Sequence, residues 1–399
     1  MKILIALTYY RPHYSGLTIY AERLARALAG HGHQVTVLTS RYDKSLPERE
    51  RSDGAQVIRL NVGMRVSKGV IMPSILLWAW KLAHQADVVL LHLPQLDAAY
   101  LALVARLLGK PVVLTYHCDL RLPEGLVHYA ANQVSHLANH ISARLAQVIV
   151  TNTRDYAENS AFLKYYLNKV RPVYPPAEVQ AVTEADLAAF RERAGVQAGQ
   201  RIIGMAARLA TEKGVEYLAE ALPLVLEKHP SARVLFVGQY ENVFGEDLYA
   251  RRLAPLIEAM GEHWKFLGTL SLAEISAFFH ECEVTVLPSL NSTESFGMVQ
   301  VESMLCGTPV VASDLPGVRQ PVMISGMGRV VPAADVQALA QAIISILDHP
   351  EKFQGDPASI TERFSPETVA VAYEEIFNRL LNREQAKVDK PRYSTRNQP

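Results

Sequence analysis

The stretch Glu294–Ser313 reads ESFGMVQVESMLCGTPVVAS and predicts a loop, a short helix and then a buried strand. Free N–H groups at a helix start near Gly297 would point at a phosphate, as helix N-termini commonly do. A carboxylate beside a phosphate is repelled, so we interpret Glu294 and Glu302 as acceptors for sugar and ribose hydroxyl groups. Glu302 lies about 7.5 Å along the helix from Gly297, a plausible reach from a diphosphate to its ribose. The stretch therefore favours a sugar-nucleotide site, although its spacing also fits a surface helix with two solvated glutamates.

Around this stretch the chain alternates short apolar runs with helical segments, which is typical of doubly wound α/β sheets. The strands predicted in a first series are Ile3–Thr8, Val35–Leu38, Val88–Leu91, Val112–Thr115 and Val148–Thr151. Those predicted in a second series are Ile202–Ala206, Val234–Val237, Lys265–Leu267, Val284–Leu287 and Val310–Ala312. The length of 399 residues exceeds the ~250–300 at which single cores stop growing. Two Rossmann-like domains are therefore expected.

A domain boundary is expected within Lys169–Glu178, where three prolines interrupt the periodic pattern. The predicted domains are residues 1–172 and residues 173–365. Residues 366–382 read as a last helix. The polar tail, residues 383–399, is expected to be disordered.

Two cationic residues follow a predicted strand of the second series. Arg208 and Lys213 come directly after Ile202–Ala206. Ligands of open α/β sheets bind at the carboxyl ends of strands, where two cations could neutralise a diphosphate leaving group. An exposed Arg and Lys near a turn can also be solvated without any ligand. His117 follows another predicted strand and is either a site residue or a histidine that is hydrogen-bonded in the protein wall.

These motifs together resemble the signature of the retaining family-4 glycosyltransferases, which have the GT-B fold. The resemblance rests on the two glutamates, the Phe296-Gly297 pair between them, the Gly-x-Pro-Val-Val-Ala segment and the Arg208/Lys213 pair. It covers nearly the whole chain. It implies two Rossmann-like domains that face each other across a cleft, with the last helix crossing back to the first domain.

The implied activity is a hexosyl-type transfer from a UDP- or GDP-sugar to the hydroxyl group of a glycan, lipid or small-molecule acceptor. The resemblance assigns catalytic roles to Glu294, His117, Arg208 and Lys213. It assigns donor contacts to Gly16, Arg208, Lys213, Gly268, Glu294, Phe296, Gly297, Met298, Val299 and Glu302.

Two departures from the family pattern stand out. Relatives usually have two glycines in the first loop, where this chain has Ser15-Gly16, and often a glutamate where it has Gly317–Gln320. The first departure affects the conformation of that loop, and the second affects acceptor or sugar preference.

Other partners are suggested by charge and composition. Residues 1–172 carry 20 Lys and Arg against 11 Asp and Glu, whereas the whole chain carries 40 of each. Such asymmetry suits an anionic partner, such as a lipid headgroup surface or a phosphorylated acceptor, or else a solvated surface. Trp78 and Trp80 fit either a core or a rim for lipid contact. Nucleic acid is not expected as a partner.

Location and cofactors follow from the same kind of reading. Three widely spaced cysteines indicate a reducing compartment, so the expected location is the cytoplasm, including the inner face of the membrane. No run of ~20 apolar residues predicts a membrane span. The chain has no Asp-x-Asp motif, so neither a metal nor another cofactor is implied.

Two other functions stay open on this scaffold. A sugar-nucleotide epimerase would act without an acceptor. A catalytically silent sugar-nucleotide-binding subunit would bind the donor without turnover. A nicotinamide oxidoreductase is disfavoured, because no Gly-x-Gly-x-x-Gly follows the first strand.

Overall fold

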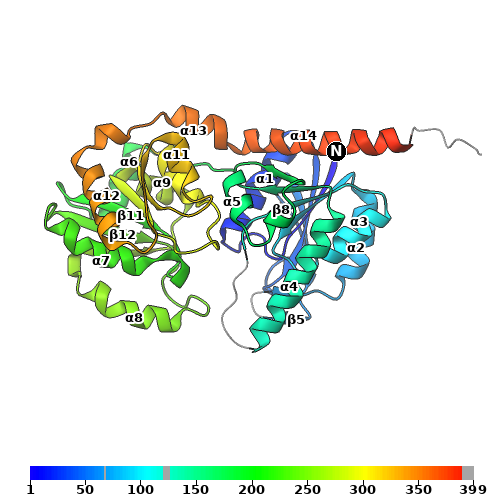
Figure 1. Ribbon diagram of the computed structural model, residues 1–399, viewed down its shortest axis with the longest axis horizontal. Coiled ribbons are helices and arrows are strands. Elements are labelled where there is room, and N and C mark those ends of the chain that lie inside the picture. Colours follow the sequence, from blue (N-terminus) through cyan, green and yellow to red (C-terminus); the bar gives the residue numbers. More distant parts are fainter. Residues whose placement is uncertain (67–68, 120–125, 389–399) are drawn as a thin grey trace, which may run out of the picture. The chain divides into compact units, whose positions relative to one another are not determined.

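The computed structural model describes residues 1–66, 69–119 and 126–388 (Figure 1). Contacts divide the chain into two units. The first unit consists of Met1–Thr151, Phe162–Val173 and the chain from Pro366 onward. The second unit consists of Asn152–Ala161 and Tyr174–Ser365. Each unit is built on one large, mainly parallel sheet.

The sheet of the first unit has the strand order β10-β9-β8-β7-β1-β2-β4-β3. Only its edge strand β3 is antiparallel to its neighbour among the pairings described. The strand bounds are β1 Lys2–Ala6, β2 Gln34–Arg41, β3 Arg49–Ser52, β4 Ala55–Asn61, β7 Val88–Leu93, β8 Val112–Tyr116, β9 Val148–Thr151 and β10 Val170–Pro172. A separate two-stranded antiparallel sheet pairs β5 Met64–Val66 with β6 Gly69–Ile71. Because β1 pairs with both β2 and β7, the strand order reverses there.

The helices of the first unit include one from the far end of the sequence. Their bounds are α1 Gly16–Gly30, α2 Ile75–Gln85, α3 Ala98–Leu107, α4 Leu126–Leu145, the 3₁₀ turn η1 Leu163–Tyr165 and α14 Pro366–Val388. The last helix, α14, lies beside α1 (Figure 1). The hydroxyl of Tyr373 in α14 is 2.8 Å from that of Tyr20 in α1 and 2.7 Å from that of Thr115 in β8. These buried hydrogen bonds attach α14 to the first unit.

The sheet of the second unit is parallel throughout, with the order β13-β12-β11-β14-β15-β16. Its strands are β11 Arg201–Ala206, β12 Ala232–Val237, β13 Trp264–Gly268, β14 Val284–Leu287, β15 Val310–Ser313 and β16 Gly328–Val331. The strand order reverses between β11 and β14, which is the switch point where doubly wound sheets bind ligands.

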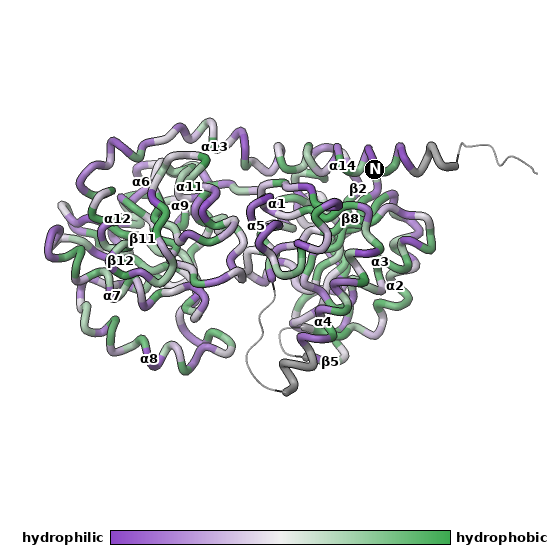
Figure 2. The backbone as a smooth tube through the Cα atoms, viewed as in Figure 1, coloured by the Kyte–Doolittle hydropathy of each residue, from purple (hydrophilic) through white to green (hydrophobic). Residues whose placement is uncertain are grey.

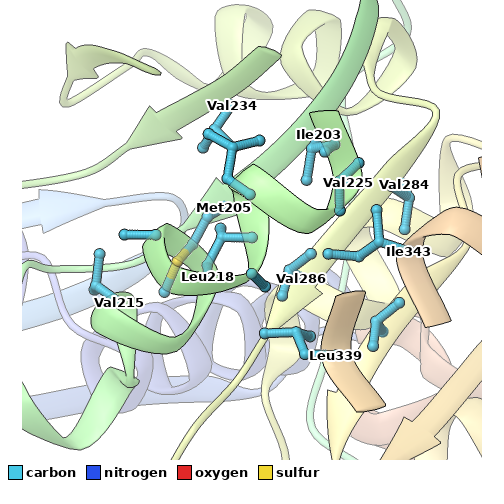
Figure 3. Close-up of a cluster of buried hydrophobic side chains, with 14 of the residues drawn as sticks. Ile203, Met205, Val215, Leu218, Val225, Val234, Val284, Val286, Leu339 and Ile343 are labelled. Carbon is cyan, nitrogen blue, oxygen red and sulfur yellow. The ribbon is translucent and has the colours of Figure 1, made fainter. Parts of the chain in front are cut away.

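The helices of the second unit cover this sheet. Their bounds are α5 Arg154–Asn159, α6 Glu184–Ala194, α7 Val215–Leu226, α8 Asp247–Glu258, α9 Leu272–Glu281, α10 Met298–Leu305, α11 Gln320–Ser325, α12 Val336–Asp348 and α13 Pro357–Phe364. Short 3₁₀ turns are η2 Thr211–Lys213, η3 Gly261–His263 and η4 Pro350–Phe353. Figure 3 shows buried side chains of β11, β12 and β14 packed against those of α7 and α12. This core holds the carboxyl ends of β11 and β14 in place.

Hydropathy along the chain follows the layers of each unit. Figure 2 shows hydrophobic colouring along central strands such as β8. All residues of β8 are buried, as the apolar run in the sequence predicts for a strand covered on both faces. Among the described residues, none of the helices combines the length and apolar character needed to cross a membrane.

The predicted doubly wound α/β class is confirmed, with differences in detail. The sequence places residues 1–172 in one domain, but Asn152–Ala161 packs with the second unit. The reason is a set of hydrogen bonds between this segment and the loops that follow β14 and β15. Residues 383–388, expected in a disordered tail, belong to α14. Residues 389–399 lie outside the described part of the chain.

Candidate functional site

The predicted donor residues of the second unit follow the two strands at its switch point. Arg208 and Lys213 come after β11, and Glu294 and Gly297 come after β14, which is paired with β11. The carboxyl ends of neighbouring parallel strands lie at the same edge of a sheet. The structure therefore gathers residues that are more than eighty positions apart in the sequence.

An ion pair joins the two loops at this edge. Lys213 Nζ lies 2.6 Å from Glu294 Oε2, and both side chains are largely buried, at 18% and 16% exposure. The N–H of Leu290 donates to the carbonyl of Glu212 at 3.0 Å, so the loop backbones are also joined. The pair is held before any ligand arrives.

Gly214 permits this close approach of the two loops. It has a φ of +64°, and a Cβ at this position would lie 2.2 Å from the carbonyl oxygen of Pro288. Any larger residue would force the β11 loop away from the β14 loop.

Arg208 contacts another acidic residue at the same edge. Its Nη2 lies 3.1 Å from Glu212 Oε1, and 45% of its side chain is exposed. An exposed ion pair of this kind is weak, so the guanidinium can turn to a ligand at little energetic cost.

The helix α10 begins beside Glu294 with its first turn uncapped by any described side chain. Its N-cap is Gly297, with a φ of +78°. Buried Gln300 fixes this turn, because its Nε2 donates to the carbonyls of Phe296 at 2.7 Å and Val318 at 2.9 Å. The open N–H groups and the helix dipole together form a site suited to an anion.

The remaining residues of this stretch that were predicted to bind the donor differ in exposure. Glu302 lies on α10 and is 9% exposed. Met298 and Val299 are half-buried in its first turn. Phe296 is 1% exposed and packs in the core between β14 and α13, so only its backbone is left to meet a donor.

Gly268 ends β13 at the same edge of the sheet. Its carbonyl accepts a hydrogen bond from the N–H of Gly238 at 2.9 Å. A Cβ at Gly268 would meet only Tyr240 at 4.0 Å, whereas one at Gly238 would lie 2.1 Å from the carbonyl oxygen of Ala207. Gly238 is therefore required by packing, while Gly268 leaves open space beside Tyr240.

Gly16 and His117 belong to the first unit. Gly16 is the first residue of α1, whose N-cap is Ser15. The Ser15 hydroxyl accepts from the N–H of Thr18 at 3.2 Å, and the Thr18 hydroxyl accepts from the N–H of Ser15 at 2.8 Å. The serine that replaces the usual glycine thus forms a capping box, a reciprocal cap that stabilises the helix start.

His117 is paired with a second histidine that the sequence analysis did not single out. His92 Nδ1 and His117 Nε2 are 2.8 Å apart, so one ring donates an N–H to the other. The rings stack with centroids 5.1 Å apart. Burial lowers the pKa of His117 to about 3 and that of His92 well below its usual value, so both rings are neutral at neutral pH.

Gln95 is a further residue that sequence reasoning missed. It follows β7, it is 5% exposed, and neither Nε2 nor Oε1 has a partner in the described part of the chain. Its place after a buried strand is the only sequence signal that could have found it. Buried amides are normally hydrogen-bonded, which makes Gln95 an unusual group.

A metal-binding site would need several side chains that could together bind a metal ion. Within residues 1–66, 69–119 and 126–388, no group of three or more His, Cys, Asp and Glu is arranged to hold a metal ion.

Comparisons with known proteins match both units. The family described as "Glycosyl transferases group 1" matches residues 188–356, and the one described as "Glycosyl transferase 4-like domain" matches residues 15–176. An uncharacterized glycosyltransferase of Methanocaldococcus jannaschii is 27% identical over 80% of this chain and 82% of its own length. A phosphatidyl-myo-inositol mannosyltransferase of Mycobacterium leprae is 27% identical over 89% of this chain and 90% of its own.

The fold also matches solved structures. HepE of Anabaena, crystallised in complex with UDP, superposes with a TM-score of 0.76 at 23% identity, covering 95% of this chain and all of HepE. The two family matches together span most of the chain, and the recognition made from the glutamate signature is confirmed. The chain belongs to the group 1 glycosyltransferases, enzymes with the GT-B fold.

Proposed function

We propose that this glycosyltransferase is a retaining enzyme that moves a hexosyl group from a UDP- or GDP-sugar to an acceptor hydroxyl. The observation that carries the proposal is the Lys213–Glu294 pair beside the uncapped start of α10. The pair supplies a cation for a phosphate and a carboxylate for sugar hydroxyls within one preformed site.

In the proposed complex, different residues bind the charged diphosphate of the donor and the hydroxyl groups of its sugars. Arg208, Lys213 and the N–H groups at the start of α10 receive the diphosphate. Glu294 accepts hydrogen bonds from the sugar hydroxyls, and Glu302 accepts them from the ribose. The exposed space beside Gly268 and Tyr240 receives the base.

In the transfer step the bond between the anomeric carbon and the leaving phosphate oxygen breaks as negative charge grows on the diphosphate. The acceptor oxygen forms the new bond from the same face, and its proton passes to the leaving phosphate oxygen. Each preorganised group that stabilises the developing charge contributes roughly 3–4 kcal/mol. Lys213 and Arg208 supply this stabilisation without a metal ion in the proposed mechanism.

His117 has a supporting role in the proposal. Because its ring is neutral at neutral pH, it can share a hydrogen bond with a hydroxyl group without introducing a positive charge.

Relatives support the ligand classes. HepE has been crystallised with UDP. The M. leprae relative is named for a phosphatidylinositol acceptor, so a hydroxyl-rich acceptor attached to a lipid is one of the acceptor classes that this proposal includes.

We also propose that the first unit contacts an anionic lipid surface from the cytoplasmic side. Neighbouring helices α2 and α3 expose the large apolar side chains Leu76, Leu77, Trp80, Leu103 and Leu107. The basic residues Lys81 and Arg106 are exposed on the same helices. Apolar side chains flanked by basic ones suit insertion at a charged headgroup layer.

Vesicle co-sedimentation tests this contact. Leu77→Glu should reduce binding to vesicles that contain anionic lipid, while Leu248→Glu, an equally exposed leucine of the second unit, should not. Equal binding to neutral and anionic vesicles by the wild type would rule out the charge contribution.

The donor assignment is tested by thermal shift and calorimetry with UDP, GDP, UDP-glucose and GDP-mannose. A ligand that binds only the folded state raises its melting temperature. NMR of the product then reports whether the anomeric configuration is retained. A new sugar isomer formed from donor alone would identify an epimerase, and binding without transfer to any acceptor would identify a silent subunit.

A further inference from the structure

The segment Asn152–Ala161 follows the last-but-one strand of the first sheet, yet it packs in the second unit. It contains the short helix α5, whose start is capped by the Thr153 hydroxyl accepting from the N–H of Tyr156 at 3.0 Å. This segment contacts the loop that carries Glu294.

Two side chains of the segment hold that loop on both sides of Glu294. The hydroxyl of buried Tyr156 donates to the carbonyl of Ser292 at 3.0 Å. Nδ2 of buried Asn152 donates to the hydroxyl of Ser295 at 3.0 Å. Ser292 and Ser295 flank Glu294, so its backbone is fixed from before and after.

Asp155 anchors the segment itself. It receives hydrogen bonds from Arg319 at 2.6 and 2.9 Å and from the N–H of Gly317 at 2.9 Å. Burial raises the pKa of Asp155, but the bonds from Arg319 and Gly317 outweigh it and leave the pKa below its usual value. The carboxylate therefore stays charged, which keeps the bidentate contact with Arg319 strong.

Packing at Gly317 completes the arrangement. A Cβ there would lie 2.2 Å from the carbonyl oxygen of Ser295 and 3.1 Å from Cβ of Tyr156. The turn after β15, helix α5 and the Glu294 loop thus meet without room for another atom.

We propose that the segment Asn152–Ala161 acts as a brace that sets the position of the Glu294 carboxylate, with Asn152 and Tyr156 as positioning residues. The inference rests on the proposed role of Glu294 in holding the donor sugar. Under this proposal, Asn152 and Tyr156, which lie in the first half of the sequence, support the donor site of the second unit.

The first experiment does not depend on the proposed function. Hydrogen exchange is measured for the amides of Thr293 and Glu294, which donate to Asn291 Oδ1 at 3.0 Å and to the Asn291 carbonyl at 3.1 Å. Tyr156→Phe keeps the buried ring and removes only the hydroxyl, so exchange of these amides should become faster. Unchanged exchange in Tyr156→Phe and in Asn152→Ala would overturn the brace.

A matched control comes from the same helix. Arg154 is half exposed and pairs only with Glu158 among the contacts described, at 52% exposure for both side chains. Arg154→Ala should leave the exchange of Thr293 and Glu294 as in the wild type.

The second experiment separates positioning from general stability. Calorimetry compares UDP-glucose and GDP-mannose with bare UDP and GDP. For the conjugate that the wild type binds, Tyr156→Phe and Asn152→Ala should each weaken binding about three- to tenfold, the worth of one hydrogen bond, and bare nucleotide binding less than about twofold. Equal weakening of conjugate and nucleotide would show a merely structural role and overturn the proposal.

Failure of the proposed function gives a different result. In that case the wild-type protein binds none of the four compounds, while the exchange experiment still decides whether the brace holds the loop.

Discussion

The carboxyl edges of the two sheets carry polar groups of opposite kinds. In the second unit they are charged and paired, as in Lys213–Glu294 and Arg208–Glu212. In the first unit they include buried, uncharged groups: the His92–His117 pair and the amide of Gln95, which has no partner among the residues that the structure describes. Paired charges suit a ligand that brings its own charge, whereas neutral groups suit hydroxyl groups. The same doubly wound architecture therefore presents charged, ion-paired groups in one unit and buried neutral groups in the other.

The largest expected effect tests the charged edge. In the proposed mechanism, Lys213→Ala removes a cation from the departing diphosphate, and in the structure it leaves Glu294 without its ion-pair partner. The kcat/KM of transfer should fall by about 10²–10³-fold, the usual loss for one preorganised group. Lys228→Ala, which changes an exposed lysine of the same unit, serves as the control. Wild-type turnover in Lys213→Ala would show that the paired charges are structural.

The next largest expected effect is a loss of stability when the backbone conformation at the start of α10 is disturbed. Gly297→Ala places a Cβ 2.3 Å from Leu287 Cδ2 at a φ of +78°, so the free energy of unfolding should drop by more than ~1 kcal/mol. Gly326→Ala shares a positive φ of +72° but meets nothing within 4 Å. Urea unfolding measures the free energy of unfolding of both variants, and the difference between their losses is the cost of the steric clash. Equal losses would show that the positive φ alone accounts for the destabilisation.

Acid should destabilise the folded protein through the buried, uncharged His92–His117 pair. Burial lowers the pKa of His117 to about 3 and lowers that of His92, so the unfolded chain takes up protons first as pH falls below about 6.5. The free energy of unfolding should therefore decline from near pH 6.5 down towards pH 3. Urea unfolding between about pH 7 and about pH 5 tests this above the range in which most carboxylates titrate. The exception is Asp97, whose pKa burial raises to about 6, so the histidine contribution is read from the difference between the wild type and a His92 variant. His92→Phe should flatten the slope, and an unchanged slope would contradict the assignment to this pair.

The smallest effect concerns Gln95. Its buried amide has no described partner, so Gln95→Leu should raise the free energy of unfolding by about 1 kcal/mol, since an unpaired buried polar group is costly. Gln85→Leu, at an exposed position on α2, should have a smaller effect. Thermal unfolding compares the two. A destabilised Gln95→Leu protein would show that the amide is already satisfied in the folded state.

The sequence predicted the elements whose pattern is local. The apolar runs that became β1, β7, β8, β11 and β14 stand out because strands buried on both faces are continuously apolar. The edge strand β3 was missed because its residues Arg49–Ser52 are polar and exposed or half-buried.

Contacts between residues far apart in the sequence limit how much of the candidate site can be predicted from the sequence. Arg208, Lys213 and Glu294 could be named from spacing and resemblance, and the Lys213–Glu294 pair lies where the switch point brings the two loops together. The contact of Asp155 with Arg319 joins residues 164 positions apart, which no local pattern encodes. His92 was missed because it lies within a buried apolar strand, where one polar residue gives no periodic signal.

The return of α14 to the first unit has a consequence for biosynthesis. Tyr373 supplies hydroxyl partners for Tyr20 and Thr115, and Glu374 binds His31 at 2.8 Å and His33 at 2.8 Å. Chains are made from the N-terminus, and domains usually fold as they emerge from the ribosome. Here α1 must wait for α14 before this core is closed, since Tyr20 and its partner Tyr373 are 353 positions apart. Expression of the first unit by itself should therefore require Pro366–Val388 to be fused behind Val173.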